Sequence, residues 1–151
     1  MLKYCRDKWY KNKDILEEEI RADRKLNSCD YEYLVKLVVD CILNPSEDDY
    51  ERFNSNNITV IDNGDYQGTQ LFMIPLKTYQ PSANEYLLTY TWYGSCSGCD
   101  TLQAIQDWSE KLPTEQQVKD YMTLCKDLVC NMVKPYSFGY AFDEKFTEIA
   151  K

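Results

Sequence analysis

Histidine is absent from this chain of 151 residues. Without imidazole, the chain cannot form a Ser-His or Cys-His nucleophile system, lacks the usual imidazole base, and cannot build a His-containing zinc site. It also lacks the glycine-rich loops that hold nucleotide phosphates and the nucleophile elbow of hydrolases. The sequence therefore favours a non-enzymatic function over an enzymatic one.

Long apolar runs are missing as well. No stretch approaches the roughly 18 consecutive apolar residues of a membrane-spanning helix, and the charged residues 1–7 do not resemble the apolar region of a signal peptide. We therefore expect no membrane association and a location in a reducing cytoplasm. The seven cysteines are odd in number and irregularly spaced, which in that compartment indicates free thiols rather than a disulfide framework.

Positive charge is scarce relative to negative charge. The chain has 17 Lys and Arg against 25 Asp and Glu, which gives a net charge of −8. This balance disfavours binding to nucleic acid and to anionic membranes, whose phosphates would repel the protein. It fits a cationic protein partner, although solubility alone is the simpler explanation.

The hydrophobic pattern changes period along the chain, and these changes predict the fold class. Apolar residues recur with helical spacing in 8–24, 29–43, 101–112 and 114–133, and strand-like runs occupy 58–61, 70–78 and 85–93. Short connections between the strands favour an antiparallel meander. We predict a single α+β domain spanning 1–151, with a three-stranded antiparallel meander and about four helices packed mainly on one of its faces.

Local signals add detail to this prediction. Asp100 with Gln103, and Thr114 with Gln117, have the spacing of helix capping boxes. Either Asn27 or Ser28 is expected to cap the helix over 29–43. Trp108 and Leu112 should lie on the buried side of the helix over 101–112. Three cysteines should be small core residues: Cys41, Cys125 and Cys130. The end of the sequence should form a short strand with Tyr136, Phe138, Tyr140 and Phe142, followed by a short helix with Phe146 and Ile149.

The most conspicuous pair of reactive residues is Cys96 and Cys99, which two residues separate. The pair lies between a predicted strand and a predicted helix, and a thiolate near a helix N-terminus is favoured by the helix dipole. The charge of Asp100 opposes that effect. We expect the two sulfurs to lie close together, at least partly exposed, at one end of the sheet.

Three interpretations of this pair remain open. The thiols could cycle between redox states, they could bind zinc with two further cysteines, or they could be incidental to a tight turn. The further zinc ligands would come from Cys5, Cys29 or Cys41, because Cys125 and Cys130 point in different directions on one helix. A thioredoxin fold is disfavoured, since no strand pattern follows the helix after the pair.

A second group of residues suggests protein binding. The acidic loop contains Glu47, Asp48, Asp49 and Glu51, and the strand region adds Tyr66, Tyr90 and Trp92. Exposed aromatic residues are favoured at protein interfaces, and the negative charge of the chain argues against base stacking. These residues are candidates for a partner-binding surface, and self-association into a homo-oligomer is also left open.

The stretches Gly64–Phe72 and Tyr93–Gln103, the latter reading YGSCSGCDTLQ, resemble a family of uncharacterised proteins from phages and prophages of Firmicutes-type bacteria. The resemblance covers residues 28 to 135 and implies a location in the infected bacterial cytoplasm, but no catalytic residues. It implies, by analogy, an accessory protein that binds a host protein and inhibits a defence system. The alternatives are a thiol- or zinc-dependent protein and a structural component of the virion or of replication.

Overall fold

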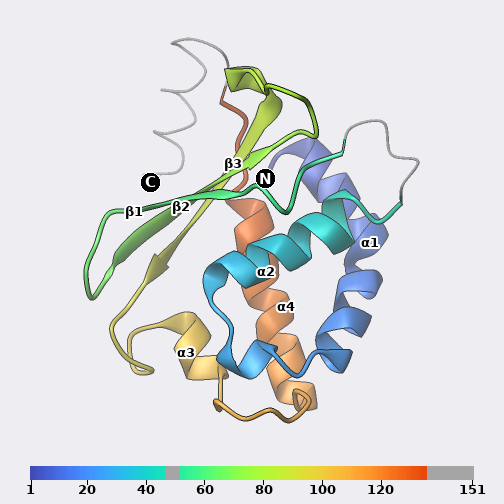
Figure 1. Cartoon of the computed structure of the whole chain (residues 1–151). Helices are drawn as coiled ribbons and strands as arrows, with labels where there is room; N and C mark the ends of the chain where they lie inside the picture. The colour runs from blue at the N-terminus through green and yellow to red at the C-terminus, as the bar shows by residue number, and fades with distance from the viewer. Residues whose placement is uncertain (47–51, 136–151) are drawn as a thin grey trace.

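The computed structural model describes residues 1–46 and 52–135 (Figure 1). Two sets of predictions lie outside these residues: the acidic loop residues Glu47, Asp48, Asp49 and Glu51, and the elements expected after residue 135. Within the described part, no helix is long and apolar enough to cross a membrane.

The sheet is the predicted antiparallel meander. It consists of β1 (Thr59–Asp62), β2 (Gly68–Pro75) and β3 (Tyr86–Tyr93) in the order β1-β2-β3. β2 ends three residues before its predicted end, because the Lys77 N–H donates to the carbonyl of Arg52 rather than to β3. The α+β fold class predicted from the sequence is confirmed.

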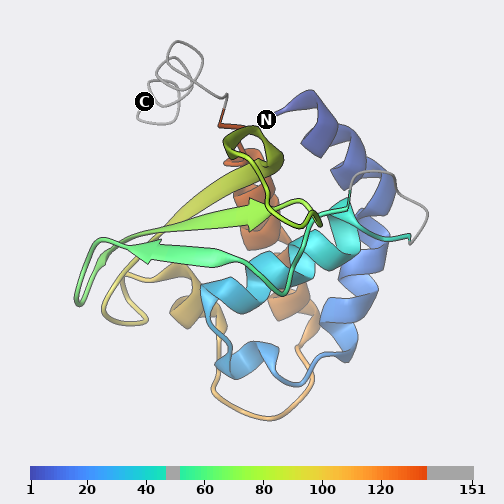
Figure 2. The same cartoon turned by 45° about the horizontal axis from the view of Figure 1, so that its top comes forward.

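The helices lie together on one side of this sheet (Figures 1 and 2). They are α1 (Lys3–Ala22), α2 (Tyr31–Val38), α3 (Thr101–Ile105) and α4 (Glu115–Cys130). α1 packs against α4 and against the end of α2. At the surface, Arg21 of α1 donates two hydrogen bonds to the carboxylate of Glu115, at 3.2 and 2.9 Å, which joins α1 to the start of α4.

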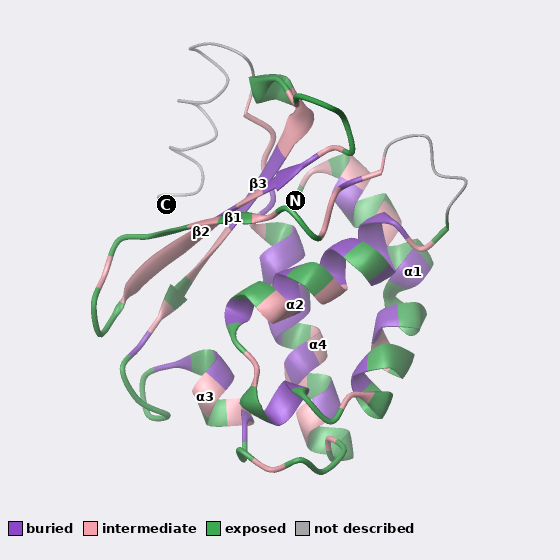
Figure 3. Ribbon diagram, in the orientation of Figure 1, coloured by how far each residue is buried: buried purple, intermediate pink, exposed green. Residues whose placement is uncertain are grey.

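The core lies between the sheet and the helices, where buried residues concentrate (Figure 3). Phe72, Ile74, Leu87 and Thr89 are wholly buried, and alternation along β2 and β3 directs them towards the helices. Thr89 is polar, but its hydroxyl donates to the carbonyl of Leu128 in α4 at 2.6 Å. This bond satisfies the buried hydroxyl and joins β3 to α4.

The end of α2 widens into a π-helical turn, Val39–Leu43, where the Asn44 N–H donates to the carbonyl of Val39. The widened turn leaves the carbonyl of Ile42 without a helical partner, and the buried side chain of Asn12 in α1 donates to it at 2.8 Å. The side chain of Asn44 donates to the carbonyl of Phe53 and accepts from its N–H, so it joins the end of the π-helical turn to Phe53.

The prediction of a helix over 101–112 is wrong beyond Ile105. The side chain of Gln106 donates to the carbonyls of Leu26 and Cys29, both at 2.8 Å, and its backbone is extended. The chain then runs alongside the 3-10 turn Leu26–Ser28, where the Trp108 N–H donates to the carbonyl of Asn27. Trp108 and Leu112, expected to be buried, are therefore exposed.

Two further expectations are corrected. Asp30, rather than Asn27 or Ser28, caps α2, because its side chain accepts a hydrogen bond from the Tyr33 N–H. Asn27 is instead buried and bonded to other segments. Cys130 is exposed, whereas Cys41 and Cys125 are buried as expected, because Cys130 lies on the outer side of the last turn of α4.

Trp108 is the only non-glycine residue with positive φ in the described part of the chain, at 60°. This conformation costs a side-chain-bearing residue about 1–2 kcal/mol, whereas glycine adopts it freely at an entropic cost of about 0.5–1 kcal/mol. Since Trp108 is 64% exposed and loses little packing, Trp108→Gly should raise the free energy of unfolding by about 0.5 kcal/mol. Trp92→Gly, at a half-exposed strand position, should lower it by about 1 kcal/mol. Urea denaturation measures both, and a loss of stability in Trp108→Gly would contradict this account.

Candidate functional site

The candidate site is the turn between β3 and α3, which carries Cys96 and Cys99. The chain leaves β3 at Tyr93, and the N–H groups of Cys99 and Asp100 both donate to the carbonyl of Cys96, at 3.1 and 2.8 Å. These bonds close a tight turn and bring the two side chains to the same side. The sulfurs lie 3.1 Å apart and both side chains are exposed, as the sequence predicted.

The buried carboxylate of Asp100 stabilises this turn by accepting hydrogen bonds from it. Its side chain is 3% exposed, and it accepts hydrogen bonds from the Gly94 N–H and the Gln103 N–H, each at 2.9 Å. The Tyr31 hydroxyl of α2 donates to the same carboxylate at 3.1 Å and accepts from the Leu102 N–H at 3.2 Å. Asp100 is thus the expected cap of α3, and through Tyr31 it also fixes the turn to the core.

Hydrogen bonds lower the pKa of the Cys99 thiol. The largest cause is the Cys96 side chain, followed by the Cys96 N–H, which donates to the Cys99 sulfur at 3.3 Å, and by smaller contributions from Ser95. Donors directed at a sulfur stabilise its thiolate form, which is the nucleophilic form. The helix dipole invoked from the sequence contributes little, because α3 has only five residues.

Four other cysteines differ from Cys99 because their pKa values are raised rather than lowered. Burial raises the pKa of Cys5 to about 11 and the pKa values of Cys29 and Cys41 to about 12, and it also raises the pKa of Cys125. Protonated, buried thiols are unreactive and are poor metal ligands. Chemistry that requires a thiolate is therefore concentrated at Cys99.

The described residues do not fit a zinc site at the pair. No group of three or more His, Cys, Asp and Glu side chains that could hold a metal ion occurs in residues 1–46 and 52–135. Zinc in proteins requires at least three protein ligands, and Cys96 and Cys99 supply two. The cysteines expected to complete a site, Cys5, Cys29 and Cys41, are buried or half-buried in the helical layer.

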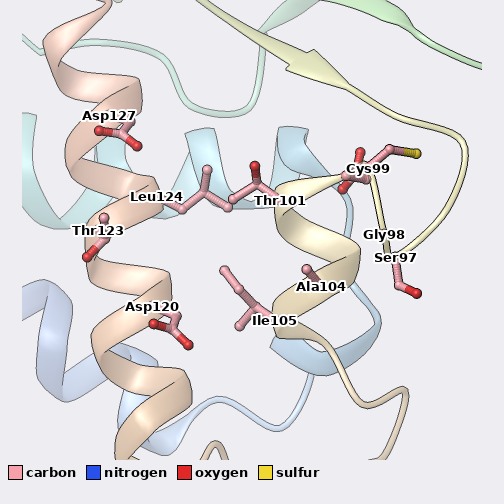
Figure 4. Close-up of a pocket in the computed structure, with 11 residues that line it drawn as sticks. Ser97, Gly98, Cys99, Thr101, Ala104, Ile105, Asp120, Thr123, Leu124 and Asp127 are labelled. Atoms are coloured by element: carbon pink, nitrogen blue, oxygen red, sulfur yellow. The ribbon is translucent and has the colours of Figure 1, made fainter.

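A cavity of about 450 Å³ lies beside the turn, between α3 and α4. Its floor is formed by Ile105 and Leu124, and Asp120 and Asp127 line its α4 side. The Cys99 sulfur points away from α4 and out of this cavity (Figure 4). Cys99 therefore borders the cavity, and its sulfur is presented to solvent.

Gly94 is the residue that lets the turn close. A Cβ at this position would lie 2.7 Å from the carbonyl carbon, the carbonyl oxygen and the sulfur of Cys99. Gly94→Ala should displace Cys99, lower the free energy of unfolding by about 1–2 kcal/mol, and slow alkylation of Cys99. Thermal denaturation and peptide mass spectrometry measure these effects.

The matched control for this prediction is Gly98→Ala in the same turn. A Cβ at Gly98 would meet only the Cys96 sulfur, at 3.8 Å, which is an ordinary contact. Stability and alkylation rate should therefore stay close to those of the unaltered chain. Equal effects of the two substitutions would contradict the role assigned to Gly94.

The three aromatic residues expected to bind a partner differ in how far they are exposed. Tyr66 lies in the loop between β1 and β2 and is 83% exposed, and Trp92 of β3 is 50% exposed. Tyr90 is half-buried, and its carbonyl accepts a hydrogen bond from the side chain of Asn131. The β1–β2 hairpin extends past the helices (Figures 1 and 2). Tyr66 lies in the loop of this hairpin, and Trp92 of β3 pairs with Thr69 at the start of β2.

The structure brings this hairpin and the dithiol turn to the same end of the sheet. Gly68 at the start of β2 pairs with Tyr93 at the end of β3. The Tyr93 hydroxyl lies 2.5 Å from a carboxylate oxygen of Asp62 and 2.8 Å from the carbonyl of Gly64, both in the hairpin. Tyr93 was not singled out from the sequence, and neither was Tyr31, because their roles depend on contacts between distant segments.

Comparison with protein-family models, with curated proteins and with solved structures gives no match for the chain. The resemblance to phage proteins therefore stays a prediction.

Proposed function

We propose that the chain carries a reversible dithiol–disulfide site at Cys96 and Cys99, with Cys99 as the attacking thiolate. The observation that carries this proposal is the 3.1 Å contact between two exposed sulfurs, one of which has a lowered pKa. A disulfide bond is about 2.05 Å long, so a small movement within the turn is enough to form it. Zinc binding by this pair stays a prediction, and the described residues bring no third ligand to it.

The oxidant in the proposed reaction is a disulfide RS–SR′. The Cys99 thiolate attacks one sulfur, which forms a mixed disulfide with the protein and releases the other half as a thiolate. The Cys96 sulfur then loses its proton to solvent and attacks the Cys99 sulfur, which releases the second thiolate. Two electrons pass to the substrate disulfide, and the protein is left with a Cys96–Cys99 disulfide.

Equilibration with a thiol–disulfide buffer of graded potential tests this proposal. Rapid alkylation and peptide mass spectrometry should detect one two-electron transition that forms the Cys96–Cys99 disulfide, while Cys5, Cys41 and Cys125 stay reduced because they are buried. If the pair stays reduced until the buried thiols also oxidise, the site has no redox function.

We further propose, as a second function, that the chain is an acidic accessory protein that binds another protein, as the phage resemblance implies. The observation that favours it is the exposure of Tyr66 and Trp92 at the hairpin end of the sheet. Large aromatic side chains contribute strongly to protein interfaces, and the net charge of −8 suits a basic partner, such as a host defence protein.

Capture of binding partners from the host bacterium tests this second function. Tyr66→Ser and Trp92→Ser should each reduce recovery of a specific partner by about tenfold or more while the fold is kept. Tyr79→Ser is the matched control, because Tyr79 is 98% exposed in the connection between β2 and β3 at the opposite end of the sheet. Equal recovery with all three variants would exclude the hairpin end as the binding surface.

A further inference from the structure

The segment that carries the two thiols is closed by a single buried carboxylate. Asp100 accepts from the Gly94 N–H with one carboxylate oxygen and from the Gln103 N–H with the other. Gly94 precedes Cys96 and Asp100 follows Cys99, so the first of these bonds joins the two ends of the segment that contains both cysteines. The position of the sulfurs relative to each other therefore depends on where this carboxylate is held.

Tyr31 holds the carboxylate from outside this segment. It is the first residue of α2, which begins beside α3 (Figure 1), and it is only 5% exposed. Burial raises the pKa of Tyr31, so its hydroxyl is protonated and donates to Asp100 at 3.1 Å. The same hydroxyl accepts from the Leu102 N–H at 3.2 Å. Because the apolar side of α2 is buried, this hydroxyl is a fixed link between the core and the turn.

The stability of a disulfide within a turn depends on how closely the turn holds its two thiols before the bond forms. A turn that already holds the sulfurs at 3.1 Å loses little conformational entropy when they close to about 2.05 Å. A turn that is free to open loses more, so its disulfide is easier to reduce. The hydrogen bonds that fix this turn therefore stabilise the disulfide relative to the dithiol.

We propose that Tyr31 is a positioning residue for the dithiol site, and that its hydroxyl, acting through Asp100, makes the Cys96–Cys99 disulfide harder to reduce. This inference rests on the proposed exchange reaction and adds the residue that controls its equilibrium. The hydroxyl bonds the carboxylate and the Leu102 N–H rather than a sulfur, so its effect reaches the thiols through the turn.

Tyr31→Phe tests the proposal, because it removes the hydroxyl and keeps the ring in the core. In a thiol–disulfide buffer, its equilibrium constant for disulfide formation should be about tenfold below that of the native chain, a shift of about 30 mV towards less negative potential. The matched control is Tyr33→Phe, also in α2, which removes a hydroxyl that donates to Asp23 at 2.6 Å. Both variants lose one hydrogen bond to a carboxylate, so a general loss of stability appears in both, whereas the midpoint should move only in Tyr31→Phe.

Amide hydrogen exchange of the reduced protein tests the route through Asp100. The Gly94 N–H donates to Asp100 rather than to Tyr31, so faster exchange there reports on the carboxylate. Its exchange should be about tenfold faster in Tyr31→Phe and unchanged in Tyr33→Phe. Unchanged Gly94 exchange in Tyr31→Phe, or equal midpoints in the two variants, would overturn this inference and leave the dithiol site in place. If the native chain forms no Cys96–Cys99 disulfide in the buffer, the proposed function fails and this inference fails with it.

Discussion

Replacing Cys99 by serine is expected to abolish the proposed disulfide exchange, whereas replacing Cys96 by serine is expected to stop it at a mixed disulfide. Cys99 has the lowered pKa, so it supplies the thiolate for the first step. In Cys99→Ser, the rate of reaction with a small disulfide at neutral pH should fall by about tenfold or more. In Cys96→Ser, one half of the disulfide should remain attached to Cys99, since no second thiol releases it.

The pH dependence provides a separate test of the same site. Alkylation of Cys99 should continue at pH values where an ordinary thiol is protonated, and its rate should fall only as the pH drops through the lowered pKa. Because the Cys96 side chain is the largest cause of that lowering, Cys96→Ala should raise the pKa of Cys99 and slow its alkylation at neutral pH.

The control for both experiments is Cys130→Ser, which removes an exposed thiol from the end of α4 without touching the turn. Exchange rate and alkylation of Cys99 should be unchanged in this variant. If Cys99→Ser reacts with the disulfide as fast as Cys130→Ser does, Cys99 is not the nucleophile.

Replacing Asn27 by alanine is expected to lower the free energy of unfolding by about 3 kcal/mol, the largest stability change expected here. The side-chain oxygen of Asn27 accepts from the Tyr121 hydroxyl at 2.7 Å and from Gln117 at 3.2 Å, and its nitrogen donates to the carbonyl of Lys111. Asn27 is completely buried, so water cannot replace these bonds without opening the structure. Chemical denaturation monitored by circular dichroism gives the value.

Asn56→Ala is the matched control for this change. Asn56 is exposed, and its side-chain oxygen accepts one hydrogen bond from Lys36. Removing the side-chain amide of Asn56 should lower the free energy of unfolding by less than about 0.5 kcal/mol. A similar loss in both variants would mean that the buried bonds of Asn27 add nothing to stability beyond those of a surface asparagine.

Features set by residues close together in the sequence formed as predicted, whereas features set by contacts between distant segments did not. The capping box of Thr114 and Gln117 is present as predicted, because both of its bonds join residues three apart. The alternation along β3 predicted that one of its sides meets the helices but left open which side, and the structure shows that it is the side with Leu87 and Thr89. The helix expected over 101–112 failed beyond Ile105, where the side chain of Gln106 bonds carbonyls about eighty residues earlier in the chain.

In the candidate site, too, local spacing predicted some features and contacts in the folded chain decided others. The spacing of Cys96 and Cys99 determined that the sulfurs could meet, and Asp100 was recognised as a cap because its partner Gln103 is three residues away. The contact of Asp100 with Tyr31, and the short distance from Gly94 to Cys99, could not be inferred from spacing. The first contact arises only when the turn packs on α2, and the second only when the carbonyl of Cys96 closes the turn.

The sequence by itself thus determined the α+β class, the meander, the main helices and the position of a dithiol turn, because periodicity, caps and turns are set by neighbouring residues. The tertiary structure alone decided which thiols are exposed and which are buried. It also decided that the hairpin and the turn share one end of the sheet, since Tyr93 contacts Asp62 and Gly64 across the strands. Burial and contacts between distant segments exist only in the folded chain, and burial is what raises the pKa of the core thiols Cys5, Cys41 and Cys125.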